Sequence, residues 1–127
     1  MTPLHVYTIV EHGFTERQAR FLGLVMRHSG VCVPRQYAQA AGIAQGAKCN
    51  AFFDRLVRRG HARAIECMHN RARLYLVHSR LLYHAIGELS SRYRRPVSPR
   101  LALERVMRLD AILSTPADQW LTTPTEK

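Results

Sequence analysis

Apolar side chains first recur at helical spacing between residues 16 and 29, and we expect the first helix there. Thr15 and Gln18 are spaced as a capping box, in which a hydroxyl and an amide satisfy free N–H groups of the first turn. Gly30 is well placed to end this helix, because glycine readily adopts the left-handed conformation that follows helix ends. Residues 1–13 show only a weak pattern, so no element is predicted before this helix.

Two more helices are predicted in close succession. Pro34 is favoured at a first helical position and opens a helix that ends at Gly42. After a turn, a third helix extends to Arg59 and is closed by Gly60. Residues 31–33 are too short for an independent strand but could pair at a sheet edge. The predicted core face of the third helix consists of Cys49, Phe52, Phe53 and Leu56.

Residues 60–78 are typical of a β-hairpin. Residues 62–65 and 74–77 are rich in side chains found in strands, and residues 68–72 form the predicted connecting loop. Asn70 suits such a loop because it tolerates the left-handed conformation that turns often need. The hairpin carries unusually many basic side chains for its length: Arg63, Arg71 and Arg73.

The pattern after the hairpin predicts a short helix, a linker and a longer helix. Ser79 caps the short helix of residues 80–86. Residues 88–98 are polar, basic and interrupted by proline, which is typical of an exposed linker. Residues 99–114 form the last helix, whose wide apolar face could pack on the same chain or on a second copy. Its apolar residues are Leu103, Val106, Met107, Leu109, Ile112 and Leu113.

The predicted fold is therefore mainly α with a small β-hairpin. We expect three parts: a domain of residues 14–87, a basic linker of residues 88–98, and a helical extension of residues 99–127. The order of helix, short strand, two helices and hairpin is that of a winged helix-turn-helix.

The charge is concentrated in the middle of the chain. The whole sequence has a net charge of +10, and residues 35–100 carry all of it. Nearly all of the basic residues are arginine, whose planar fork suits phosphates and guanine edges. A polyanionic partner, most naturally nucleic acid, is the indicated class of ligand. A GC-rich genome would explain arginine in place of lysine, but it would not explain the clustering.

Residues 15–78 resemble a winged-helix domain of the kind found in MarR-like regulators. The segments FTERQARFL, FFDRLVRRGHA, RARLYLVHSRLLYHAIGE, RYRRPVS and RLALERVMRLDAIL are similar to the replication-relaxation family of bacterial plasmids and integrative elements. This resemblance implies a DNA-binding regulator or a replication or transfer accessory factor. It also implies a longer protein, of which this chain would be an N-terminal part.

The helix-turn-helix reading assigns roles to individual residues. The start of the third helix normally meets base edges, so the predicted base contacts are Gln45, Lys48 and Asn50. The predicted contacts with the DNA backbone are Arg35, Arg55, Arg58, Arg63, Arg71, Arg73, Arg94 and Arg95. The alternative for these side chains is a solvated surface on which Asp54 pairs with Arg58. Arg92, Arg94 and Arg95, together with Tyr93, form the densest basic cluster of the sequence. A second phosphate contact with Tyr93 stacking and a solvated linker are equally open for this cluster.

Other chemistry is not indicated. The three cysteines form no CxxC pair, the histidines form no paired metal-binding motif, and the phosphate-loop and hydrolase motifs are absent from the sequence. We therefore expect no enzyme activity, no cofactor and no metal. The N-terminus has no signal-peptide pattern, and no apolar run is long enough to cross a membrane. A cytoplasmic bacterial protein is expected. The alternative function is a winged-helix module that docks an acidic protein partner, and RNA binding also fits the charge.

Overall fold

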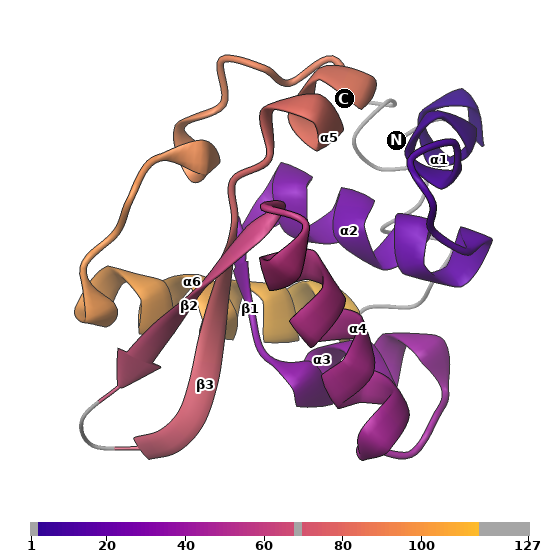
Figure 1. The fold of residues 1–127 in the computed structure, drawn as a ribbon. Coiled ribbons are helices and arrows are strands. Elements are labelled where there is room, and N and C mark those ends of the chain that lie inside the picture. Colours follow the sequence, from indigo (N-terminus) through magenta and orange to yellow (C-terminus); the bar gives the residue numbers. More distant parts are fainter. Residues whose placement is uncertain (1–2, 68–69, 115–127) are drawn as a thin grey trace.

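A computed structural model describes residues 3–67 and 70–114 of the chain. This part is mainly helical with one small antiparallel sheet, as the sequence predicts (Figure 1). In chain order the elements are α1 (Pro3–Val10), α2 (Glu16–His28), β1 (Val31–Cys32), α3 (Pro34–Ala41), α4 (Ala47–Arg58), β2 (Ala62–Cys67), β3 (Asn70–Val77), α5 (Arg80–Ala85), the short 3-10 helix η1 (Arg92–Arg94) and α6 (Pro99–Leu113).

The predicted start of α2 is confirmed in atomic detail. The backbone N–H of Gln18 donates to the Thr15 hydroxyl at 3.1 Å, and the Thr15 N–H donates to the Gln18 side chain at 3.0 Å. The sequence did not predict α1, whose residues are almost all apolar and so lack the alternation that marks an amphipathic helix. Val6 and Ile9 of α1 are nonetheless buried in the main core.

The three strands pair in the order β1–β3–β2. The hairpin loop is shorter than predicted, because β3 begins at Asn70, which pairs with Cys67 across a register shift. Backbone hydrogen bonds can extend a ladder past the last apolar side chains, so residue composition placed the start of β3 too late in the sequence. In the described part of the chain only glycines have positive φ angles, so Asn70 does not use the left-handed conformation that it could tolerate in a loop. Residues 68–69, the rest of the predicted loop, lie outside the described residues.

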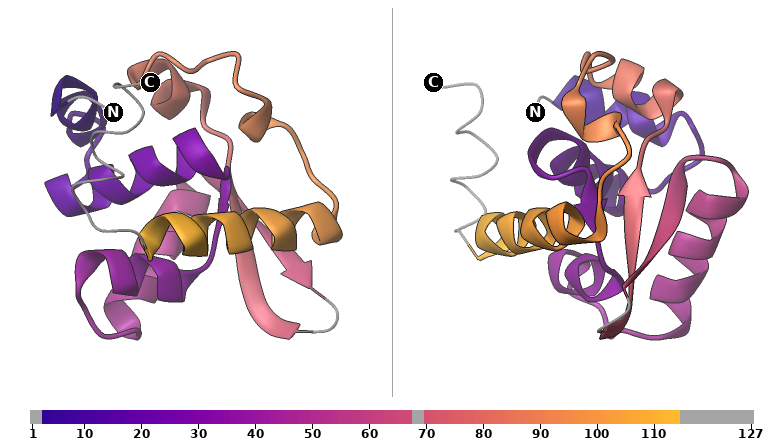
Figure 2. Two further views of the ribbon diagram at one scale, coloured as in Figure 1. Left: turned by 180° about the vertical axis from the view of Figure 1, so that it is seen from behind. Right: turned by 90° about the vertical axis from the view of Figure 1, so that its left-hand side faces the viewer.

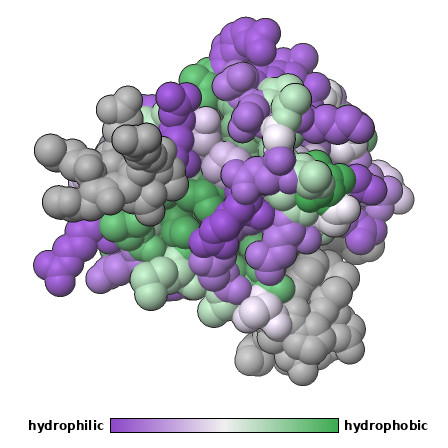
Figure 3. All heavy atoms as spheres, turned by 90° about the horizontal axis from the view of Figure 1, so that it is seen from below, coloured by the Kyte–Doolittle hydropathy of each residue, from purple (hydrophilic) through white to green (hydrophobic). Residues whose placement is uncertain are grey.

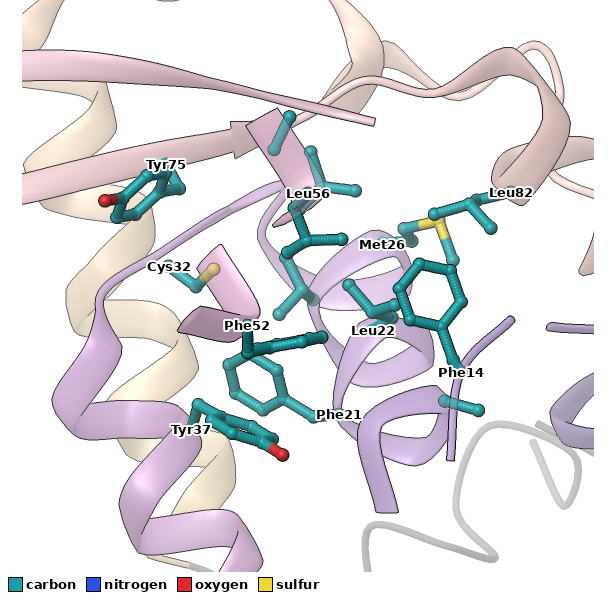
Figure 4. Close-up of a cluster of buried hydrophobic side chains, with 14 of the residues drawn as sticks. Phe14, Phe21, Leu22, Met26, Cys32, Tyr37, Phe52, Leu56, Tyr75 and Leu82 are labelled. Carbon is teal, nitrogen blue, oxygen red and sulfur yellow. The ribbon is translucent and has the colours of Figure 1, made fainter. Parts of the chain in front are cut away.

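The sheet separates two cores, because alternate residues of a strand point to opposite faces. On one face, Cys32 and Tyr75 join an aromatic core with α2, α3 and α4, part of which is drawn in Figure 4. On the other face, Leu74 and Leu76 pack against Val106 of α6, in a smaller aliphatic core. Figure 2 shows α4 and α6 on opposite sides of the sheet.

The segment predicted as an exposed linker is packed against the domain. Arg94 donates through Nε to the His78 carbonyl at 3.2 Å and through Nη1 to the Leu89 carbonyl at 3.0 Å. The backbone of Tyr93 lies so close to Gly30 that a Cβ on that glycine would be 2.6 Å from the Tyr93 oxygen. The domain boundary predicted at residue 98 therefore lies between two segments that both pack against the same domain. Residues 115–127 of the predicted extension lie outside the described residues.

Within the described ranges, every helix is too short or too polar to cross a bilayer.

Candidate nucleic-acid interface

The α4 helix is held by the apolar face that the sequence predicts. Cys49, Phe52, Phe53 and Leu56 are all buried, and the Phe53 ring stacks on Tyr75 with centroids 4.7 Å apart. A helix that buries one face presents the opposite one to solvent. The outward residues of α4 are therefore those between and beyond the buried positions: Ala47, Lys48, Asn50, Ala51, Asp54, Val57 and Arg58.

Two open hollows flank α4. The first, which we name the hairpin groove, has a volume of about 560 Å³ and is lined by Val33, Pro34, Arg35, Gln45, Asn50, Asp54, Arg73 and Tyr75. The second, which we name the α2 groove, has a volume of about 770 Å³ and lies between α4 and the start of α2. Its polar and charged lining includes Arg17, Gln18, Lys48, Arg55 and Arg58. The lining of the hairpin groove includes two arginines and Asp54, and that of the α2 groove includes three arginines and Glu16.

The predicted base-contact residues are divided between these grooves. Gln45 and Asn50 line the hairpin groove, whereas Lys48 lines the α2 groove. All three are exposed. They lie at the turn before α4 or in its first half, so a ligand that follows the start of the helix can meet both sets.

The arginines of α4 differ in how free they are. Arg55 is half-buried: its Nη2 donates to Gln18 Oε1 at 2.9 Å, and its guanidinium lies 5.5 Å from the centroid of the Phe14 ring. Arg58 is exposed. The ion pairs found among the described residues join Arg20 to Glu16 and Arg35 to Asp110, so Asp54 does not neutralise Arg58 as the alternative reading supposed.

The arginines of the hairpin do not share one face, although the sequence analysis grouped them. Arg73 lines the hairpin groove with Tyr75 and so faces α4. Arg63 alternates with Ala62, which belongs to the α4-side core, and shares its side of β2 with Ile65, which packs on the α6-side core. Arg63 therefore points to the other side of the sheet from Arg73. Arg71 belongs to β3, but its side chain lies outside the described part of the structure.

Two predicted phosphate contacts already have partners within the chain. Arg35 forms two parallel hydrogen bonds with Asp110, each 2.8 Å long, across α3 and α6. This pairing raises the pKa of Arg35 and lowers the pKa of the Asp110 carboxyl, chiefly through those hydrogen bonds. Arg94 is used in the contacts with backbone carbonyls described above. Arg95, in contrast, is exposed.

Sequence reasoning missed Arg17, which lines the α2 groove beside Lys48 and Arg58. Arg17 lies in the first turn of α2, and no local signal in the sequence shows that this turn lies beside α4 in the folded chain. Figure 1 shows the α3–α4 turn, the end of β2 and the start of β3 at the same, lower end of the molecule. Seen from below, that end is dominated by hydrophilic side chains around smaller hydrophobic areas (Figure 3).

A metal site finds no support in the described ranges, where no three histidine, cysteine, aspartate or glutamate side chains come together to hold an ion. Comparisons of the chain with protein-family models, curated proteins and solved structures gave no match.

Proposed function

We propose that this protein binds double-stranded DNA in a sequence-specific way, as a winged helix-turn-helix in which α4 is the recognition helix. Its role would be that of a transcriptional regulator or of a replication or transfer accessory factor of a plasmid or integrative element. The observation that carries the proposal is the placement of Lys48, Arg58 and Arg73. These exposed cations lie on both flanks of an outward-facing helix. None of them forms an ion pair with a carboxylate among the described residues.

The shape of α4 supports this assignment. The helix has 12 residues and is therefore about 18 Å long, and a major groove about 12 Å wide accepts a single helix. Ala47 and Ala51 are exposed and small, so the helix backbone can approach base edges closely. Gln45 and Asn50 supply amides, which can pair with adenine, and Lys48 can pair with guanine.

The proposal is tested by fluorescence anisotropy on mixed-sequence duplex DNA between roughly 50 and 200 mM salt, where phosphate contacts weaken steeply. We expect Arg58→Ala and Arg73→Ala to weaken binding to all sequences and to lower the salt slope by about one each. Lys48→Ala and Asn50→Ala should instead change the preferred sequence after selection from a random pool.

Arg80→Ala is the matched control, because Arg80 is exposed at the start of α5 and contributes to neither groove. It should leave the affinity nearly unchanged. If Arg80→Ala and Arg58→Ala lose the same DNA affinity, the net charge of the protein alone would explain the binding. Absence of binding at the lowest salt would overturn the proposal and favour an acidic protein partner instead.

A homodimer through residues 99–114 stays a prediction. Val106 and Leu109 of that helix are buried within the same chain, so they are not available to a second copy. Only the outer apolar residues of α6 could serve, chiefly Leu103 and Met107, which are 38% and 69% exposed.

A further inference from the structure

Three arginines surround one tyrosine where η1 meets α6. The guanidinium carbon of Arg92 lies 5.3 Å from the centroid of the Tyr93 ring, and that of Arg105 lies 5.0 Å from it. Arg108 donates from Nη1 to the Tyr93 hydroxyl at 2.9 Å. We call Arg92, Arg105 and Arg108 the arginine cluster. The ring thus gathers three positive charges that come from two separate segments of the chain.

No carboxylate forms an ion pair with a member of the arginine cluster among the described residues. Arg20 and Arg35, in contrast, each pair with a carboxylate. Nη1 of Arg105 is buried with no hydrogen-bond partner in the described structure. Burial, together with the charges of Arg92 and Arg108, lowers the pKa of Arg105. Burial, Arg27 and Arg108 similarly lower the pKa of the neighbouring His28.

We propose that the arginine cluster is a binding site for a phosphate group. Guanidinium groups match phosphate oxygens through pairs of parallel hydrogen bonds, and three of them would neutralise a doubly charged phosphate. Their contacts with the Tyr93 ring restrict the long side chains before a ligand arrives, which reduces the entropy lost on binding. A bound anion would also relieve the repulsion between the three like charges.

The position of the cluster separates it from the α4 interface. Arg105 and Arg108 belong to α6, which lies on the other side of the sheet from α4 (Figure 2). None of the three arginines of the cluster lines either of the grooves beside α4. We therefore assign the phosphate to a ligand other than a duplex seated on α4, either a second segment of nucleic acid or a small phosphorylated molecule. The site does not depend on the proposed role of α4.

The first arm of the test uses pyrophosphate as the probe. Pyrophosphate is titrated into the protein at constant ionic strength, and the arginine Nε–Hε signals are followed by two-dimensional NMR. We expect the signals of the arginine cluster to shift, and Arg92→Gln and Arg108→Gln to weaken binding about tenfold each. Arg80→Gln is the matched control and should bind pyrophosphate as the unaltered protein does.

The second arm uses a short duplex and the Lys48→Ala/Arg58→Ala protein, in which the α4 interface is weakened. If the phosphate comes from nucleic acid, the duplex still shifts the cluster signals, and adding Arg92→Gln and Arg108→Gln removes the remaining binding. If it comes from a small ligand, only pyrophosphate produces the shifts. Either result supports a phosphate site.

The proposal fails if neither probe moves the cluster signals, or if Arg80→Gln weakens binding as much as the cluster variants do. The cluster would then be a clamp that holds η1 on α6. Because Arg92 and Arg108 are exposed, their glutamine variants are expected to fold, and the thermal unfolding midpoint without anion checks this. Loss of DNA binding in Arg58→Ala alone tests α4 and leaves this site untouched.

Discussion

The two sides of the sheet are stabilised in different ways. On the α4 side, rings from α2, α3, α4 and β3 pack edge-to-face and stacked, with Phe53 in contact with Phe21, Tyr37, Phe52 and Tyr75. On the α6 side the core is aliphatic and smaller. It is supplemented by polar contacts, in which Gln36 donates to the Val106 carbonyl at 2.9 Å and to Asp110 at 3.0 Å.

This difference bears on what each helix can offer a ligand. The α4 helix is fixed by apolar burial, so its polar residues are available to solvent. In α6, by contrast, Asp110 forms hydrogen bonds with Arg35 and Gln36 of α3, so this carboxylate holds the helix in place and is not available to a ligand.

The largest expected effect is on the aromatic side. Phe53 is fully buried and touches four other rings, so Phe53→Ala should reduce the free energy of unfolding by about 3–5 kcal/mol. Urea denaturation followed by circular dichroism measures this change. Val57→Ala, on the exposed flank of the same helix, should stay within about 0.5 kcal/mol of the unaltered protein. A loss in Phe53→Ala no greater than in Val57→Ala would contradict the account of this core.

An intermediate effect is expected from the buried amide on the α6 side. Gln36 is fully buried and accepts a hydrogen bond from the Val33 N–H at 3.0 Å. Gln36→Leu leaves that donor without its partner and should reduce the free energy of unfolding by about 1–3 kcal/mol. The control is Gln39→Leu, an exposed position on the same helix. If the two variants unfold at the same urea concentration, the polar contacts do not stabilise α6.

The smallest effect concerns the pair of Asp110 and Arg35, whose side chains are 35% and 52% exposed. Asp110→Asn should reduce the free energy of unfolding at neutral pH by only about 0.2–1 kcal/mol, because water and salt screen the pair. The asparagine can still accept the hydrogen bond from Gln36, so the change isolates the charge.

This last effect has a definite pH dependence. The folded-state pKa of Asp110 is lowered, so the contribution of the ion pair is complete above the unfolded pKa of about 3.9. It is lost as the pH falls from there through the folded pKa. The difference in stability between the unaltered protein and Asp110→Asn should therefore shrink between pH 5 and pH 2. A difference that grows in acid would show that the carboxylate is not stabilised in the folded protein.

The sequence predicted the parts of the candidate site that depend on local signals. The buried face of α4 follows from four apolar residues at helical spacing, and the start of α2 follows from a capping box. The exposure of Lys48 and Arg58 then follows from helix geometry. By contrast, Arg55 was assigned to DNA but also donates to Gln18, which lies 37 residues earlier.

What the sequence by itself determined is the order and type of most elements, because caps, glycine stops and hydrophobic spacing act within a few residues. Only the tertiary structure decided which charged groups meet. Asp110 lies 75 residues from Arg35 along the chain, and Arg105 contacts the ring of Tyr93, which belongs to a separate segment. The separation of Arg63 from Arg73 likewise depends on which face of the sheet each core covers. Such contacts are set by how the elements pack, and no local pattern in the sequence encodes them.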